Sequence, residues 1–270
     1  MAWTSVISTV RADDQGKIRE RVYAVVLGGG LIFIGAVAWQ LAVMAGAVDE
    51  FLTSSPVLVI EGVVKQIVSG ELLVNIGISG LEFIVAFAVA SVFGISLGLL
   101  MGRLRYVKYA IEPYVWLLYS SPVIALFPLI VLIFGLGAPS VVFIAIMLAI
   151  VPLIVNAMQG VDNVDPGLIK VVESFGGNEL QLLRKVVLPA SFPTIMAGVR
   201  LGMGRAVVGV VVGELFAGQG GIGYSIDKYA SELNTTQVFS SVLIVIVAGL
   251  VLNFIARALE RASSGWRTDL

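Results

Sequence analysis

Long apolar runs separated by short polar segments dominate the hydropathy pattern of this 270-residue chain. A helix needs about 20 mostly apolar residues to cross ~30 Å of hydrocarbon, because each backbone polar group must be satisfied within the segment. The longest run, 113–161, is too long for one crossing and contains a turn at 135–140 that divides it into two. The pattern therefore predicts an all-helical membrane protein with six spans, formed by residues 24–48, 74–102, 113–161 (two spans), 189–215 and 238–256.

The composition supports a membrane protein and excludes several classes of chemistry. Hydrophobic residues make up 58% of the chain and charged residues 13%, and the mean hydropathy is +1.00, whereas about a quarter of a soluble domain is charged. A net charge of -1 argues against a nucleic-acid partner. The chain has no cysteine and no histidine, which excludes disulfides, thiol nucleophiles and the usual zinc or haem ligands. We expect no metal site, no cofactor in this chain and no catalysis by it.

Two glycine patterns bear on nucleotide binding. The chain contains no G-x-x-x-x-G-K-[ST] motif, so it cannot hold ATP phosphates in a P-loop, and any energy must come from another chain or an ion gradient. Residues 218–223, GQGGIG, match the dinucleotide pattern G-x-G-x-x-G, but they follow a membrane span and not a strand. We predict a re-entrant or outer loop there.

Lysine and arginine are unevenly distributed along the chain, and this sets the expected orientation. One side would hold the basic residues Arg11, Lys17, Arg19, Arg21, Arg103, Arg105, Lys108, Lys170, Arg184, Lys185, Arg257, Arg261 and Arg267, and the other Lys65 and Lys228. We therefore expect residues 1–23 and 261–270 to be cytoplasmic tails of a single membrane domain over 24–260. The first residues lack the apolar core and cleavage site of a secretory signal.

The longest charged interruption, residues 165–189, predicts two short cytoplasmic helices joined by a tight turn. Asp165 can cap a helix that Pro166 begins, and its apolar face would comprise Leu168, Ile169, Val172 and Phe175. Gly176 and Gly177 would end that helix. A capping box formed by Asn178 and Gln181 would begin the second helix, and Pro189 would end it. The apolar stripe of this helix would comprise Leu180, Leu183 and Val187.

Residues 120–137, 151–169 and 182–204, together with this hairpin, resemble permease subunits of ATP-binding-cassette (ABC) importers. The similarity extends from about Ser54 to Arg261 and is greatest to the nitrate, sulfonate and taurine branch. In that family a Glu-Ala-Ala triplet precedes the hairpin glycine. Here the triplet positions are Lys170, Val171 and Val172, so a lysine replaces the glutamate and Glu173 is the alternative source of a carboxylate.

The resemblance implies a type I importer fold, a homodimer, two ATPase subunits that bind ATP and Mg, and an extracytoplasmic solute-binding protein. It assigns ATPase docking to residues 165–189, in particular to Lys170, Glu173, Ser174, Phe175, Gly176, Gly177, Asn178, Leu188 and Pro189. From spacing alone, a hairpin that merely connects two spans is equally compatible. The implied cargo is a small anion such as a sulfonate, nitrate or aromatic carboxylate.

Several features inside the predicted membrane domain have two readings each. Gly94, Gly98 and Gly102 form a flat helix face for packing within the bundle or between subunits. Residues 54–67 predict an amphipathic helix on the outer surface, which either covers the bundle or contacts a partner. Prolines within the third and fourth spans predict kinks, which serve either packing or a solute path; they are Pro122, Pro128 and Pro152.

The candidate translocation path comprises Ser120, Ser121, Pro122, Asn156, Arg205 and Glu214, with the third and fifth spans lining it by resemblance. The polar side chains would bind a solute or bond neighbouring helices. Arg200 occupies a position that is commonly arginine in similar permeases, and we favour a structural role. Arg205 departs from the family pattern and either attracts an anion or pairs with Glu82 or Glu214.

We predict the transmembrane permease subunit of an ATP-driven importer in the inner membrane of a prokaryote. The alternative is an ion-gradient-driven secondary transporter or channel in which Glu82, Arg205 and Glu214 form a relay. That alternative calls for two inverted halves and discontinuous spans, and the sequence pattern shows neither.

Overall fold

The computed structural model describes Tyr23 and residues 27–264, and every regular element among them is a helix. It separates into two units, Met1–Gly62 and Val63–Leu270. The predicted tail 1–23, except Tyr23, and residues 265–270 of the predicted tail 261–270 lie outside the described residues. The last helix continues to Ser264, so the beginning of the second predicted tail is helical.

The first unit contains the predicted first span and the start of the predicted surface helix. The helix Leu27–Met44 is long and apolar enough to cross a membrane. After the short helix α2 (Glu50–Thr53), α3 (Pro56–Val68) confirms the helix expected over 54–67. Its position on the outer surface stays a prediction.

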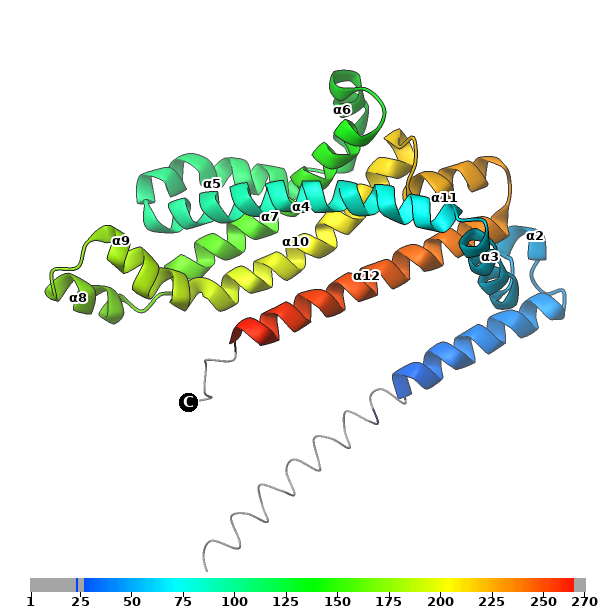
Figure 1. Ribbon diagram of the computed structural model, residues 1–270, viewed down its shortest axis with the longest axis horizontal. Helices are drawn as coiled ribbons and strands as arrows, with labels where there is room; N and C mark the ends of the chain where they lie inside the picture. The colour runs from blue at the N-terminus through cyan, green and yellow to red at the C-terminus, as the bar shows by residue number, and fades with distance from the viewer. Residues whose placement is uncertain (1–22, 24–26, 265–270) are drawn as a thin grey trace, which may run out of the picture. The chain divides into compact units, whose positions relative to one another are not determined.

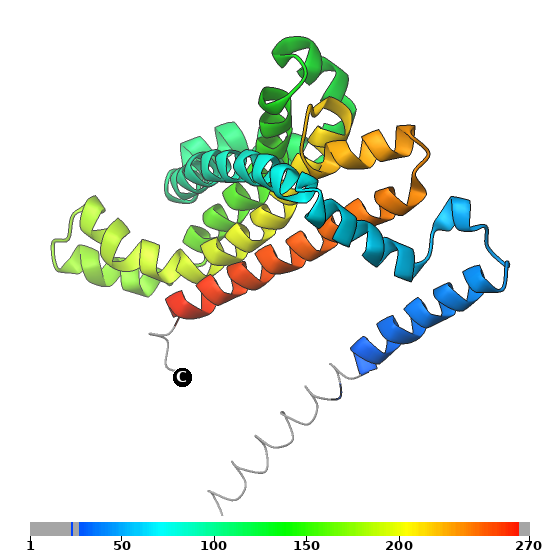
Figure 2. The same cartoon turned by 45° about the vertical axis from the view of Figure 1, so that its right-hand side comes forward.

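The second unit is a bundle of long helices with two small helical layers at opposite ends (Figures 1 and 2). Its elements are α4 (Glu71–Arg103), α5 (Arg105–Ser120), a 3₁₀ turn (Val123–Leu126), α6 (Phe127–Phe134), α7 (Ala138–Asp162), α8 (Pro166–Ser174), α9 (Glu179–Leu182), a π-helical turn (Leu183–Val187), α10 (Leu188–Ala217), α11 (Ile222–Ser231) and α12 (Thr235–Ser264). In the described part of the chain five helices can cross a membrane, or six if the bent pair α5 and Val123–Phe134 is one span. The all-helical, six-span prediction is thus confirmed.

The third predicted span is broken where a kinked helix was expected. α5 ends at Ser120, and the chain bends by 88° before Val123–Phe134. Pro122 precedes the 3₁₀ turn and Pro128 lies in the first turn of α6, so neither interrupts the interior of a helix. A first-turn proline loses no hydrogen bond, because the N–H groups there have no helical partner. Of the three prolines, Pro152 is the one in a helix interior, that of α7.

The buried helix α7 is the centre of this unit, and rows of glycine bring its neighbours close to it. A side chain at Gly94 would meet Leu153 at 2.9 Å, and one at Gly102 would meet Val161 at 2.5 Å. On α10, the other helix that packs against α7, side chains at Gly209 and Gly213 would meet the α7 backbone at 2.5 and 2.9 Å. Packing within one subunit therefore accounts for the predicted glycine face of α4.

At the end of the bundle that carries α11, hydrogen bonds join α3 to α12 and α11 to α4. Gln66 of α3 donates to Gln237 and Ser241 of α12, over 2.8 and 3.2 Å. The Tyr229 hydroxyl of α11 donates to the Glu71 carboxylate over 2.7 Å. Burial raises the pKa of Tyr229, and the bond to Glu71 acts in the same direction, so the hydroxyl keeps its proton as a donor.

Candidate functional site

The α8–α9 hairpin forms one end of the second unit, and the sequence determines both helix starts locally. The Asp165 carboxylate accepts the Gly167 N–H over 2.7 Å, which confirms the first cap. Asn178 and Gln181 form both bonds of the predicted capping box, over 2.9 and 3.0 Å. Each cap satisfies N–H groups that a helix start leaves without partners.

The turn between the two helices depends on its two glycines for different reasons. Gly176 has φ of 70°, the left-handed region, with nothing within 4 Å of an added side chain. Its N–H donates to Glu173 O, and the next N–H, of Gly177, donates to Val172 O over 2.9 Å. A side chain at Gly177 would collide with Val172. Gly176 is thus needed for conformation and Gly177 for space.

The prediction that Pro189 ends the second helix is wrong. The chain stays helical from α9 through the π-helical turn Leu183–Val187 into α10, where Pro189 occupies the first turn. An α-helical proline clashes with the carbonyl four residues earlier, and a π-helical turn at that position widens the helix. Leu188 and Pro189 therefore join the hairpin to the membrane helix without a break.

The apolar side chains of the hairpin divide into two sets. Ile169, Val172 and Leu183 pack against a buried cluster made of Val161, Val164, Leu182 and Val187. An outer set, Leu168, Val171, Phe175 and Leu180, is exposed by 49, 53, 88 and 54%. The single face predicted for the first helix is thus wrong: Ile169 and Val172 point inward, while Leu168 and Phe175 point outward with Val171. We call the four exposed residues Leu168, Val171, Phe175 and Leu180 the hairpin knob.

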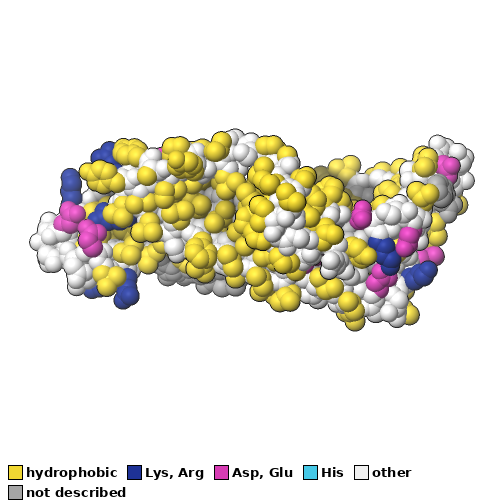
Figure 3. Space-filling model, turned by 90° about the horizontal axis from the view of Figure 1, so that it is seen from above, with side chains coloured by type: hydrophobic (Ala, Val, Ile, Leu, Met, Phe, Trp, Pro, Cys, Tyr) yellow, Lys and Arg dark blue, Asp and Glu magenta, His cyan; other side chains and the backbone are white. Residues whose placement is uncertain are grey.

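Two ion pairs lie near the hairpin end of the bundle: one joins the hairpin to α4, and the other joins α5 to α7. Arg103, at the end of α4, donates to both Glu179 carboxylate oxygens, the shorter contacts being 2.7 Å. Lys108 of α5 pairs with Asp162 at the end of α7 over 2.6 Å. The sequence analysis used Arg103 only as a basic charge that sets orientation, and no local pattern relates residues 76 positions apart. Figure 3 shows Lys, Arg, Asp and Glu side chains gathered at the left-hand end of the view, beyond a face that is covered mainly by hydrophobic side chains.

If the hairpin docks an ATPase as the resemblance implies, removal of the Arg103–Glu179 bridge should weaken the coupling between ATP hydrolysis and the membrane helices moderately. We expect Arg103→Ala and Glu179→Ala each to lower solute-stimulated ATP hydrolysis of the assembled complex by about two- to fivefold, because exposed pairs contribute up to ~1 kcal/mol. The exchanged pair Arg103→Glu with Glu179→Arg should recover part of the loss. Arg105→Ala, which removes a nearby arginine without an ion pair among the described residues, is the control. Equal activity of all variants would contradict this role.

The polar hairpin residues assigned by resemblance are accessible. Lys170 and Glu173 are exposed, and neither forms an ion pair with another described residue. The Ser174 hydroxyl is already engaged, because it donates to Lys170 O over 2.8 Å. Which of Lys170 and Glu173 contacts a partner stays a prediction.

The neutral residues of the predicted path bond their own helices. Ser120 donates to Trp116 O over 2.8 Å and Ser121 to Leu117 O over 2.7 Å, both at the exposed end of α5. Asn156 donates to Pro152 O over 2.8 Å and packs where Gly198 of α10 leaves space. All three therefore stabilise the ends and kinks of helices, and a solute role for them stays a prediction.

The two arginines of α10 have different surroundings. Arg200 pairs with Glu260 of α12 over 2.8 Å, the structural role that we favoured. Arg205 is exposed and makes no hydrogen bond or ion pair with a described residue. Glu214 lies nine positions later, about two and a half turns at 3.6 residues per turn, and so points to the opposite side of α10.

Glu214 is fully buried and its carboxyl contacts Glu82, so the proposed pairing of Arg205 with either acid is wrong. The placement of Glu214 along the path is corrected for the same reason, since its side chain lies inside the subunit. A relay through Glu82, Arg205 and Glu214, which the secondary transporter requires, has no continuous route.

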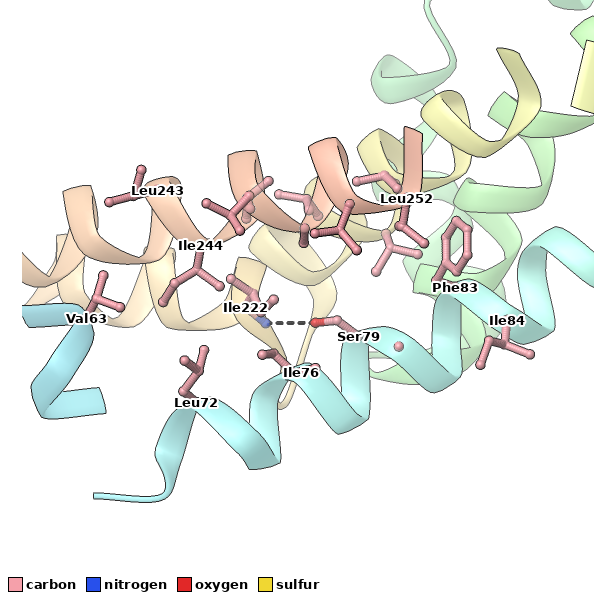
Figure 4. A pocket seen from close by; sticks show the side chains of 18 residues that line it. Val63, Leu72, Ile76, Ser79, Phe83, Ile84, Ile222, Leu243, Ile244 and Leu252 are labelled. Carbon is pink, nitrogen blue, oxygen red and sulfur yellow. Dashed lines mark hydrogen bonds between the residues drawn. The ribbon is translucent and has the colours of Figure 1, made fainter. Parts of the chain in front are cut away.

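A cleft of about 610 Å³ lies between α4, α10, α11 and α12 (Figure 4). Its walls are apolar side chains such as Leu72, Phe83 and Leu252. The polar side chain among its lining residues is Ser79, and its oxygen accepts the Ile222 N–H over 2.9 Å. With no charged or unpaired polar group, this cleft is unsuited to a small anion.

Long apolar helices and a polar-capped hairpin with an exposed apolar knob define a multi-pass membrane protein. The chain matches the family described as binding-protein-dependent transport system inner membrane component over residues 90–265, and it belongs to that family. The inner-membrane location and the ABC permease resemblance are thereby confirmed.

Individual relatives agree with this assignment. The chain is 31% identical to the aliphatic sulfonates transport permease protein of Bacillus subtilis, over 86% of this chain and 84% of the relative. It is 29% identical to the taurine transport system permease protein of Escherichia coli, over 70% and 69%, and 31% identical to the riboflavin transport system permease protein of Chloroflexus aurantiacus, over 86% and 87%. The inward-facing MetNI methionine ABC transporter shares the fold, with a TM-score of 0.56 and 20% identity over 70% of this chain and 96% of that one.

Proposed function

We propose that this chain is the membrane half of an ATP-driven importer and that its hairpin knob binds a separate ATPase subunit. The observation that carries the proposal is the exposure of Leu168, Val171, Phe175 and Leu180 on a hairpin joined to α10 without a break. An apolar face on a short helix fits a hydrophobic groove in a partner. Movement of that partner would reach the membrane through the continuous helix and the Arg103–Glu179 bridge.

The proposed complex contains two copies of this chain, two ATPase subunits and an extracytoplasmic solute-binding protein. ATP and Mg would bind to the ATPase subunits, and this chain would have no catalytic site of its own. Lipid and the second copy would cover the exposed apolar surface of the helices, which is too extensive for a water-soluble monomer. ATP binding would shift the pair between inward-open and outward-open states.

We propose a small anion, of the sulfonate type, as the cargo. Arg205 supports this, because an exposed, unpaired cation on a membrane helix is costly unless it faces water or an anion. The sulfonate and taurine relatives support the same class. The relative named for riboflavin transport is as similar to this chain as the sulfonate relative is, so the choice of an anionic cargo rests on Arg205 and not on the relatives alone.

Truncation of Phe175 tests the docking role. We expect Phe175→Ala to weaken ATPase binding about 30-fold or more, because a central aromatic anchor contributes ~2 kcal/mol or more. The measurement is the amount of ATPase that co-purifies with the tagged permease as ATPase concentration varies. Tyr106→Ala removes an aromatic residue of similar exposure, 91% against 88%, outside the hairpin. Equal ATPase binding by Phe175→Ala and Tyr106→Ala would overturn the docking proposal.

A further inference from the structure

Two carboxyl groups meet inside the bundle, one from α4 and one from α10. Glu82 is 6% exposed and Glu214 is 0% exposed. The side chains are within hydrogen-bonding distance of each other. Two ionised carboxylates cannot form that bond, because each is an acceptor without a proton.

The remaining contacts of Glu214 suit a carboxylate. One oxygen accepts the Gly223 N–H over 2.7 Å, at the first turn of the ten-residue helix α11, and the Ser79 hydroxyl lies beside the same carboxyl. A helix N-terminus carries partial positive charge and favours an anion. Gly221 allows this approach, because a side chain there would collide with the carboxyl.

Among the described residues Glu82 has no comparable donors, and each acid has one oxygen without a partner there. These atoms are Glu82 Oε2 and Glu214 Oε1, both buried. The ion pairs in the described part of the chain involve other carboxylates, so no lysine or arginine neutralises either acid. A buried acceptor without a donor is destabilising, and a second uncompensated buried charge is more so. A single proton shared by the two acids removes one of the charges and supplies a donor between them.

We infer that Glu82 and Glu214 form a buried proton-binding site, with the resident proton on Glu82 and hydrogen-bonded to the Glu214 carboxylate. The site fastens α4 to the α10–α11 connection. Gly221 N–H donates to Asn75 and Ile222 N–H to Ser79, so three successive N–H groups of this connection are held by α4 and Glu214. The loop 218–223 is thereby assigned a structural role that depends on the proton.

A proton fits this site better than a metal ion. The described residues contain no group of three or more acidic, histidine or cysteine ligands. A sodium ion is the competing occupant, since two carboxylates and a serine hydroxyl are oxygen ligands. The two occupants differ in an observable way: a proton gives a carboxylic-acid C=O stretch, and sodium leaves two carboxylates and makes stability depend on sodium concentration.

Infrared spectroscopy of the purified permease in lipid tests the inference. At pH 8 a solvent-exposed glutamate is ionised, since its pKa is about 4.3, so a protonated-carboxyl band in the wild-type protein must come from an unusual site. We expect this band in the wild type, its loss in Glu82→Gln and its retention in Glu232→Gln, which alters an exposed acid of the same type. Isotopic labelling of glutamate carboxyls identifies the band in the wild type without any variant.

The same preparations give a second readout. Glu82→Gln should fold at wild-type yield, because its amide N–H replaces the proton as donor to Glu214. Glu82→Leu should lower the yield, because it leaves a Glu214 oxygen without a donor. The absence of a protonated-carboxyl band from the wild type, or its persistence in Glu82→Gln, would overturn the inference. Thermal stability that requires sodium, without such a band, would assign the site to sodium instead.

Discussion

Replacing Gly176 by valine should weaken ATPase association about five- to 150-fold while the membrane domain still folds. Gly176 has φ of 70°, and nothing lies within 4 Å of an added side chain, so the effect is purely conformational. A β-branched residue in this region costs ~1–3 kcal/mol. If the hairpin knob binds only in this turn conformation, the apparent affinity falls by the same free energy, about five- to 150-fold.

The control for this variant is Gly176→Asn, because asparagine tolerates the left-handed region. It should bind ATPase within a few fold of the wild type. Both variants should elute as folded permease in detergent, since the turn lies at the end of the bundle and buries no side chain. Wild-type ATPase binding by Gly176→Val would show that the hairpin docks without this turn, and the proposed role of the knob would lose its geometric basis.

The hairpin shows which structural features are encoded locally. Its caps and glycine turn could be predicted because each depends on residues within five positions of one another, as in the bonds between Asn178 and Gln181. The division of its apolar residues into a buried set and an exposed set could not be predicted in this way. Ile169 and Val172 turn inward because a cluster that includes Val161 lies beneath them, and that cluster exists only once α7 and the π-helical turn are in place.

The pairing of charged residues was the least predictable feature. The spans themselves follow from hydropathy, and the glycine spacing in α4 indicated close packing without naming α7 as its partner. The sequence raised Arg205 as the partner of Glu82 or Glu214, on the ordinary expectation that opposite charges pair. Packing instead joins the two acids and leaves the arginine exposed, because nine positions on one helix separate Arg205 from Glu214 by half a turn.

Replacing Arg205 by methionine should reduce transport at least about tenfold without reducing assembly or basal ATP hydrolysis. The side chain is exposed, its helix face is free of partners among the described residues, and charge in a narrow water-filled path concentrates the opposite charge by 10-fold or more. Methionine keeps the length and packing of the stem and removes the charge. The measurement is uptake of a labelled short alkanesulfonate into proteoliposomes that contain the complete complex and its binding protein.

Two further variants distinguish attraction of the anionic solute by Arg205 from a role of the arginine in folding. Arg205→Lys should restore part of the uptake, because attraction at a distance needs a point charge and not the forked guanidinium geometry. Arg200→Met removes the partner of Glu260 from the same helix, so it should lower the yield of folded permease more than the activity of each assembled complex. Uptake by Arg205→Met at the wild-type rate would exclude Arg205 from the path, and uptake of neutral riboflavin in place of the sulfonate would overturn the anionic cargo. An unpaired arginine on a membrane helix would then require a carboxylate from the second copy, and a lowered dimer yield of Arg205→Met would identify that contact.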